Sequence, residues 1–253
     1  MKFSLSLSLI FASLQLLSTA VLAEEHPSIN YPTNLAPSAQ LHYHIKAKQS
    51  GFSLDGEADV NWQVGGSNST QTYSIKTETR AAILGKILQA DSTGLIDSFG
   101  LAPDQFEEKR LGKPATQTRF DRKTKTLNFS ESSETYPLKG GEQDRTSAVW
   151  QLVSIARAAP AQFIPNSQWK LFVAGRRDAE KWTFTVDDNV TISTPFGNVA
   201  TVHIIKAPPP DSKDQRLDIW LAPSMEWYPV RLKFSDANGD TIDQILDRVK
   251  NNP

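Results

Sequence analysis

The sequence contains no cysteine, which excludes disulfides, thiolate metal sites, a cysteine nucleophile and a lipid-anchored cysteine. It also lacks an excess of one charge sign, because 27 Lys and Arg stand against 28 Asp and Glu. This balance gives no reason to expect binding to nucleic acid or to an anionic membrane surface. The motifs of phosphate loops, dinucleotide sites, serine hydrolases and zinc proteases are absent too, so the sequence shows no reaction.

One long apolar run is present, and it lies at the N-terminus. Lys2 precedes an uncharged stretch over residues 3–22, a small-residue cleavage pattern ends at Ala23, and the acidic Glu24 follows. This layout predicts a secretory signal peptide over residues 1–23, cleaved after Ala23. The alternative is a retained membrane anchor, which the many Ser, Thr and Gln of the stretch disfavour. Export without cysteine predicts a periplasmic protein that has no membrane span after cleavage.

The rest of the chain is dominated by alternation of apolar and polar residues. After a proline-rich lead-in over residues 24–39, predicted to be flexible, short alternating runs are bounded by Gly, Pro, Asn or Asp. Such runs predict antiparallel strands with one buried and one wet face. Residues 81–90 fit a helix or a strand. Residues 241–250 are also ambiguous, and the Asn238-Gly239 turn before them favours a returning strand.

One segment has helical spacing instead of alternation. Over residues 145–158 apolar residues recur at helical intervals, Asp144 can cap the start, and Pro160 lies beyond the end. The segment is apolar nearly all round, which is typical of a helix buried on most of its surface. The predicted fold is therefore mainly β, a strongly curved antiparallel sheet or half-barrel wrapped around one central α-helix. We expect it to form a single domain over residues 40–250.

The polar residues predict no catalytic site, no metal site and no cofactor. His42 and His44 share a strand face, but two ligands alone do not make a metal site, so a solvated face is the better interpretation. His203 is interpreted as a strand residue, and the segment at 236–240 as a hairpin rather than a calcium loop. Three carboxylates spaced two apart are interpreted as the solvated face of an edge strand: Asp55, Glu57 and Asp59.

Six tryptophans are spread over nearly every predicted element. Their ordinary role is core packing, and the alternative is an apolar groove between sheet and helix that holds a lipid or acyl chain. The residues predicted to line that groove are Trp150, Leu152, Trp182 and Trp220. Because Trp220 is out of phase with its neighbours, either both faces of its strand are covered or Trp220 is exposed for a partner.

An ordered set of short phrases is similar to a known family. The phrases are Ser92–Ile96, Gly100–Pro103 with Phe106, Phe120-Asp121, Asp144 with Ser147, Thr194–Gly197, Ile219–Pro223 and Tyr228–Arg231. In this order and spacing they resemble the bacterial exported family called domain of unknown function 3108, over about residues 40–248. The resemblance implies motif positions without an assigned role: Gly94, Pro103, Phe106, Asp144, Ser147, Pro195, Gly197, Trp220, Pro223 and Pro229.

The predicted architecture is also similar to periplasmic lipoprotein carriers of the LolA/LolB type, which implies a hollow for acyl chains. We therefore expect a non-enzymatic binding or cell-envelope maintenance protein, with a hydrophobic or acyl ligand as one candidate partner. One alternative is an interaction module that docks another envelope protein through a sheet edge. A second alternative is a hydrolase with a dispersed site. No nucleic-acid partner is expected.

Overall fold

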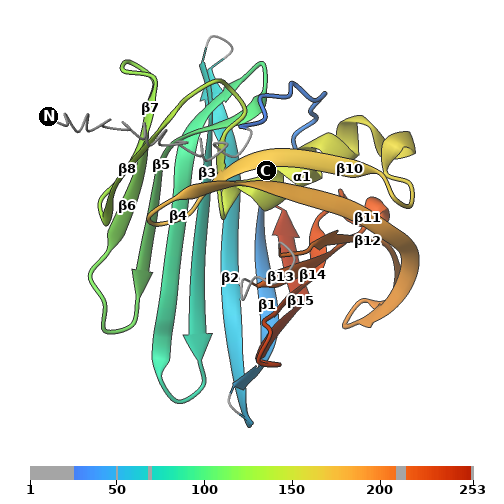
Figure 1. Ribbon diagram of the computed structural model, residues 1–253. Helices are drawn as coiled ribbons and strands as arrows, with labels where there is room; N and C mark the ends of the chain where they lie inside the picture. Colours follow the sequence, from blue (N-terminus) through green and yellow to red (C-terminus); the bar gives the residue numbers. More distant parts are fainter. Residues whose placement is uncertain (1–25, 50, 68–69, 209–214, 252–253) are drawn as a thin grey trace, which may run out of the picture.

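The computed structural model describes residues 26–49, 51–67, 70–208 and 215–251 (Figure 1). The predicted signal peptide and its cleavage position lie outside these residues. The described chain is mainly β and contains one α-helix. Its strands are β1 (Ala39–Gln49), β2 (Phe52–Ser67), β3 (Thr70–Ala81), β4 (Gly85–Asp97), β5 (Gly100–Arg110), β6 (Thr116–Asp121), β7 (Thr126–Phe129), β8 (Ser132–Pro137), β9 (Gln143–Asp144), β10 (Gln168–Ala174), β11 (Ala179–Thr194), β12 (Gly197–Lys206), β13 (Arg216–Leu221), β14 (Pro229–Ser235) and β15 (Thr241–Asn251).

All fifteen strands belong to one sheet, in the order β8-β7-β6-β5-β4-β3-β2-β1-β15-β14-β13-β12-β11-β10-β9. From β1 to β8 and from β10 to β15, strands that follow one another in sequence pair antiparallel. Strand β1 pairs with β15, so the two halves of the chain join in the middle of the sheet. The short strand β9 pairs in parallel with β10. The sheet is curled and open, with β8 and β9 at its edges, and it does not close into a barrel.

The strands predicted from alternation are confirmed for most of the chain. The structure also decides both ambiguous segments. Residues 82–84 form a turn and β4 begins at Gly85, while the segment after the Asn-Gly turn is the strand β15. The interpretation of residues 55–59 as part of an edge strand is wrong, because β2 lies between β1 and β3. Sequence alternation reports which face a residue takes, whereas the position of a strand in the sheet depends on distant pairing partners.

The helix α1 (Ser147–Ala158) begins two residues after the predicted start, because residues 145–146 form a turn. Nine of its residues are buried, and α1 contacts β5, β9 and β10. The ring of Trp150 stacks on Trp62 of β2, with ring centroids 4.5 Å apart and an angle of 12° between the planes. The helix therefore packs into the largest hydrophobic core of the described chain, together with residues from both halves of the sheet.

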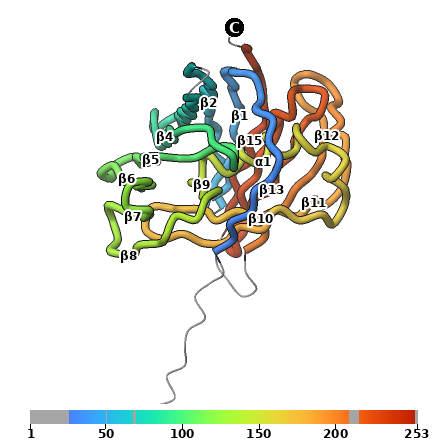
Figure 2. The backbone as a smooth tube through the Cα atoms, turned by 90° about the horizontal axis from the view of Figure 1, so that it is seen from above, coloured from blue at the N-terminus to red at the C-terminus, as the bar shows by residue number. Residues whose placement is uncertain are grey.

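Residues 26–38 have no regular secondary structure but pack on the sheet and helix. The backbone N–H of Asn34 donates to the carbonyl of Ser154 in α1 at 2.9 Å, and the indole N–H of Trp62 donates to the carbonyl of Ala36 at 3.0 Å. The hydroxyl of Tyr31 accepts a bond from the backbone of Lys170 in β10. This described part of the lead-in, blue in Figure 2, is therefore anchored alongside α1 and β10.

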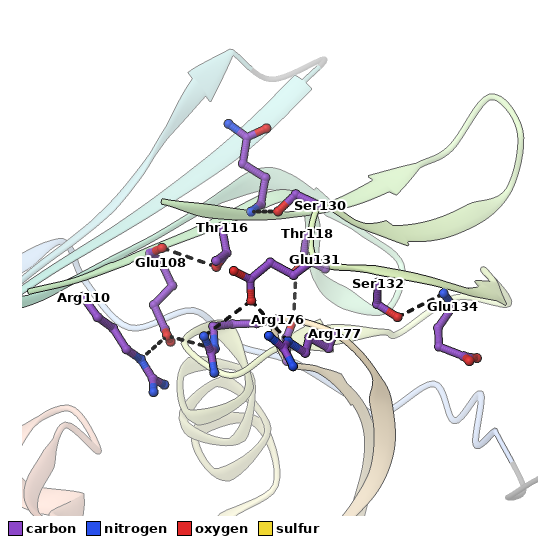
Figure 3. Close-up of polar contacts among 12 residues, drawn as sticks. Glu108, Arg110, Thr116, Thr118, Ser130, Glu131, Ser132, Glu134, Arg176 and Arg177 are labelled. Atoms are coloured by element: carbon purple, nitrogen blue, oxygen red, sulfur yellow. Dashed lines mark hydrogen bonds and ion pairs between the residues drawn. The ribbon is translucent and has the colours of Figure 1, made fainter. Parts of the chain in front are cut away.

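Side chains connect the two edge regions of the curled sheet. Arg176, in the turn between β10 and β11, reaches Glu108 of β5 at 3.5 Å and Glu131 after β7 at 3.6 Å (Figure 3). Arg177 also pairs with Glu131 at 3.2 Å, and the hydroxyl of Thr118 donates to the carbonyl of Gly175 at 2.8 Å. A small second core, with residues of β6 and β7 against β10 and β11, lies nearby. We name the ion pairs of Arg176 and Arg177 the closing cluster.

Replacing Arg176 by alanine is expected to lower the free energy of unfolding by about 2 kcal/mol, because Glu108 is only 6% exposed and loses one of two cationic partners. Urea unfolding followed by circular dichroism measures this change. Arg248→Ala is the control, since its side chain is 72% exposed, and the expected effect is within about 0.5 kcal/mol. Equal effects of the two variants would contradict a stabilising role for the closing cluster.

Candidate functional site

Four hairpin connections meet at one end of the sheet, which we call the open end: β1–β2, β3–β4, β5–β6 and β14–β15. They share this end because neighbouring antiparallel strands alternate in direction. The opposite end holds α1, where the amide of Gln151 bonds the backbone of Phe99, between β4 and β5, and of Leu101 in β5. Figure 1 shows the first three hairpins pointing downward, away from α1.

Large apolar side chains are exposed at the open end. Six of the nine large apolar residues exposed in the described chain lie there: Phe52 (74%), Leu54 (37%), Ile83 (87%), Leu84 (58%), Leu111 (56%) and Ile242 (40%). Single exposed apolar residues are ordinary on protein surfaces, but a group of them marks an interaction site. The open end is therefore the first candidate for function.

A cavity of about 210 Å³ opens between the strands at this end, and we call it the mouth cavity. Its apolar lining comes from Ile45, Ala47, Leu54, Ile87, Phe234 and Ile242. The register explains this lining, because Ala47 lies opposite Leu54 on one side and Ile242 on the other, and Ile242 lies opposite Phe234. Charged residues complete the wall: Lys48, Asp55, Arg80, Asp236 and Asp240. A lining that combines apolar and charged side chains suits an amphiphile.

The segment at 236–240 closes the β14–β15 turn. One carboxylate oxygen of Asp236 accepts bonds from the backbone N–H groups of Asn238, at 2.9 Å, and Asp240, at 3.0 Å. The hairpin interpretation is confirmed by these bonds. Among the described residues no group of three or more His, Asp or Glu side chains is placed to hold a metal ion.

A second and larger groove, of about 740 Å³, lies over β1–β4 and β15. Side chains of both charge signs line it, among them His42, Asp59, Lys76, Glu78 and Arg248. His42 is held by Asp59, with Nδ1 2.7 Å from the carboxylate oxygen, and His44 faces Asp55 at 3.9 Å. Because the charges of this groove alternate and partly pair with one another, it does not favour a ligand of one charge sign.

His203 lies in a network of carboxylates on the sheet surface. Its Nδ1 is 3.0 Å from Asp187 and its Nε2 is 2.8 Å from Asp218, which also binds Arg216. Burial opposes ionisation of Asp218, but hydrogen bonds from Arg216 and His203 hold its pKa well below the ordinary value. Both ring nitrogens of His203 are therefore engaged by carboxylates, and neither is left to activate a nucleophile.

The four predicted ligand residues all belong to the main hydrophobic core. Trp150 and Leu152 lie in the core, and Trp182 contacts Lys206 and Glu180 of the neighbouring polar network. Trp220 stacks on His203 at 4.5 Å and lies 4.7 Å from the guanidinium of Arg231. Both faces of its strand are thus covered, and Trp220 is only 9% exposed. None of the four lines the mouth cavity or the larger groove.

Sequence reasoning missed the open end, although a local signal was present. Exposed apolar residues stand beside turn glycines in three hairpins, as Gly51-Phe52, Leu84-Gly85 and Leu111-Gly112. Loops are usually polar, so an apolar residue in a turn is unusual. An alternating pattern does not reveal such positions, because Leu84 and Leu111 lie in turns and Phe52 is the first residue of its strand.

Several motif positions of the resemblance are needed for close packing or turns. A Cβ atom on Gly94 would lie 2.2 Å from the carbonyl oxygen of Ala102 and 2.7 Å from Cα of Pro103, so only glycine fits. Gly197 has φ of 94° in the β11–β12 turn that Pro195 opens. The remaining motif positions in this group are buried or begin short elements: Phe106, Pro223 of the 3₁₀ turn Pro223–Met225, and Pro229 of β14.

Asp144 and Ser147 anchor the start of α1. One carboxylate oxygen of Asp144 accepts bonds from the backbone N–H groups of Thr146 and Ser147, both at 2.8 Å. The other accepts the hydroxyl of Ser92 at 2.5 Å, and Ser92 contacts the hydroxyl of Tyr73 at 3.0 Å. Complete burial raises the pKa of Asp144 to about 6. A ligand cannot reach this fully buried group, so its position indicates a structural role.

A sequence model of the family described as "Protein of unknown function (DUF3108)" matches residues 40–247. No curated protein matches the chain. Among the described residues, no helix has the length and apolar character needed to cross a membrane.

Solved structures with a similar course of the chain include three proteins of low sequence identity. A protein described as exported, with a YmcC-like fold, from Bacteroides fragilis is 10% identical with a TM-score of 0.37, and covers 88% of this chain and 100% of its own. A protein described as a lipoprotein from Parabacteroides distasonis is 12% identical with a TM-score of 0.39, covering 89% and 100%. A protein described as an outer membrane lipoprotein-sorting domain from Vibrio parahaemolyticus is 9% identical with a TM-score of 0.31, covering 85% of each chain.

Proposed function

The chain belongs to the family of unknown function DUF3108, and we propose that it is an exported, non-enzymatic binding protein that takes an apolar or acyl ligand at its open end. The observation that carries this proposal is the mouth cavity, an apolar hollow reached from solvent and bordered by exposed apolar side chains. Export rests on the signal peptide predicted over residues 1–23. In this proposal the sheet wraps around α1, which fills one end of the hollow and leaves the other open.

The size of the mouth cavity limits the ligand. Sites for drug-sized molecules have volumes of about 300–1,000 Å³, whereas this cavity has about 210 Å³. It fits one end of an acyl chain, with the remainder of the chain lying along Phe52, Leu54 and Ile242 at the rim. Of the two cations in the wall, Arg80 already pairs with Glu78, which leaves Lys48 to pair with an anionic head group.

The arrangement of polar groups favours binding over catalysis. His203 has both nitrogens on carboxylates, and Asp144 is sealed in the core. Charged groups around the mouth cavity bond to the turn or to neighbouring strands, as Asp236 and Arg80 do. A dispersed hydrolase site would need a base with a free acceptor nitrogen or oxygen beside a nucleophile.

The double variant Phe234→Ser with Ile242→Ser is expected to weaken binding of a fluorescent fatty acid at least about tenfold, because it removes apolar area from the mouth cavity. Fluorescence titration of the purified exported chain measures this, and native mass spectrometry with lipid extraction identifies any ligand that copurifies. Phe196→Ser is the matched control, since Phe196 is 44% exposed and lines neither cavity.

Circular dichroism melting of both variants separates lost binding from lost folding. A wild-type chain that carries no lipid and binds no fatty-acid probe would overturn the proposal. If the double variant of Phe234 and Ile242 melts like wild type and binds the probe with unchanged affinity, the ligand binds elsewhere. The larger charged groove would then be the next surface to test.

A further inference from the structure

Three neighbouring hairpins at the open end each carry exposed apolar residues at their tips. The β1–β2 tip (residues 46–49 and 51–54) presents Phe52 and Leu54, and the β3–β4 tip (residues 80–86) presents Ile83 and Leu84. The β5–β6 tip (residues 109–113) presents Leu111. Ile83 is 87% exposed and Phe52 is 74% exposed, so both side chains stand almost wholly in solvent.

The charges of these three tips are mostly positive, although Asp55 lies opposite Lys46 and the fourth hairpin of the open end carries Asp236 and Asp240. The tip residues include seven Lys or Arg and no Asp or Glu, in a chain whose formal net charge is -1. All seven side chains are exposed: Lys46, Lys48, Arg80, Lys86, Lys109, Arg110 and Lys113. Arg80 and Lys86 pair with Glu78, and Arg110 pairs with Glu108. The other four form no ion pair within the described residues, so the tips keep a local positive charge.

The tips form a row. Strands β1 to β6 are consecutive neighbours in the sheet, and neighbouring strands lie about 4.8 Å apart. Successive tips are therefore about 10 Å apart, and the row spans about 20 Å. Figure 1 shows all three tips on the side of the molecule away from α1. One flat surface can contact the three together.

We propose that this row of tips docks the protein on an anionic lipid surface. The apolar residues of the tips enter the boundary between head groups and acyl chains, and the lysines pair with lipid phosphates. A lipid surface fits better than a protein partner, because protein interfaces are depleted in lysine whereas anionic lipids attract lysine clusters. Four residues border the mouth cavity and also belong to the tips: Phe52, Leu54, Lys48 and Arg80. The docking is therefore tested at four residues that do not line that cavity: Ile83, Leu84, Lys109 and Lys113.

Vesicle flotation tests the docking. The chain is purified after export, with its N-terminus established by mass spectrometry, so that an uncleaved apolar leader does not contribute. Phosphatidylcholine vesicles are compared with vesicles that contain about one third phosphatidylglycerol. We expect partitioning to the anionic vesicles only, falling as salt rises. The double variant Ile83→Ser with Leu84→Ser is expected to bind at least about tenfold more weakly.

Matched variants separate the contributions. Ile164→Ser removes an isoleucine that is 58% exposed outside the tips, and it is expected to bind vesicles like wild type. Lys109→Gln with Lys113→Gln is expected to reduce binding to anionic vesicles, and the exposed pair Lys123→Gln with Lys170→Gln is not. The proposal would be overturned if the wild-type chain did not bind anionic vesicles. It would also be overturned if the double variant of Ile83 and Leu84 bound them as tightly as wild type.

The same preparations report on the mouth cavity. Fatty-acid binding that persists in a chain without vesicle binding would overturn the docking and leave the ligand proposal intact. Vesicle binding that persists in the Phe234 and Ile242 variant, with fatty-acid binding lost, supports the docking as a separate property. If the tips bound a protein and the chain did not bind vesicles, the proposed docking on a lipid surface would be wrong.

Discussion

Replacing Trp150 by alanine is expected to lower the free energy of unfolding by about 3–5 kcal/mol, the usual range for a buried aromatic residue replaced by alanine. Trp150 is 4% exposed, stacks on Trp62 of β2, and meets the ring of Tyr228 nearly edge-on at 6.1 Å. These contacts connect α1 to two distant parts of the sheet. The loss therefore combines removed apolar contact with a cavity that a stacked ring cannot fill.

Guanidinium unfolding followed by circular dichroism measures this loss. Trp150→Phe is the conservative comparison, and we expect it to cost less, because a smaller ring still faces Trp62. Trp227→Ala is the positional control, since Trp227 is only partly buried and packs on Phe163 at the margin of the core. A Trp150→Ala variant within about 1 kcal/mol of wild type would contradict a helix packed in the core.

The free energy of unfolding is expected to fall by up to about 3 kcal/mol as the pH rises from about 4 to about 7, because of Asp144. Burial raises the pKa of this carboxyl group to about 6 in the folded chain, against an ordinary value of 3.8. An acid whose pKa is higher in the folded state stabilises that state while it is protonated. Its contribution is fully present below the ordinary pKa and is lost as the pH rises through the folded pKa.

Asp144→Asn isolates this contribution. The amide keeps an oxygen that accepts the bonds from Thr146 and Ser147, and its NH₂ group faces the hydroxyl of Ser92. Urea unfolding at several pH values is expected to give a flatter profile over pH 4–7 for this variant than for wild type. Asp218 does not mask the effect, because its pKa is lowered and its contribution changes below that window.

An exposed carboxylate provides the control for the pH series. Asp104→Asn removes a side chain that pairs with Arg122 on the surface, and it is expected to keep the wild-type profile. If Asp144→Asn also keeps that profile, the buried carboxyl group does not titrate in this range. Ser92→Ala, which removes the hydroxyl bonded to Asp144, would then show whether that bond stabilises the start of α1.

Local charge and net charge lead to different expectations at the open end. The near-zero net charge gave no reason to expect binding to an anionic membrane surface, and that inference holds only for the chain averaged over its length. The cations of the tips come from three hairpins that are separated in sequence, with acidic residues between them. Only the order of strands places these cations in one row.

The sequence alone determined which residues form strands and where the helix lies. Residues two apart in a strand share a face, so a strand with one buried face has alternating apolar and polar residues. The same local argument predicted the strand after Asn238-Gly239 and the helix near residues 145–158. It also left Trp220 with two open alternatives, since a strand residue on the outer face can be covered or exposed.

Tertiary structure decided what the pattern left open. Trp220 is covered because His203 and Arg231 stand beside it on neighbouring strands, and neither is close to it in sequence. The mouth cavity likewise forms because β1 pairs with β15, which brings Ala47 and Ile242 together across almost the whole chain. Alternation depends on residues two positions apart, whereas cavities and surface rows depend on long-range strand pairing, which the local pattern does not encode.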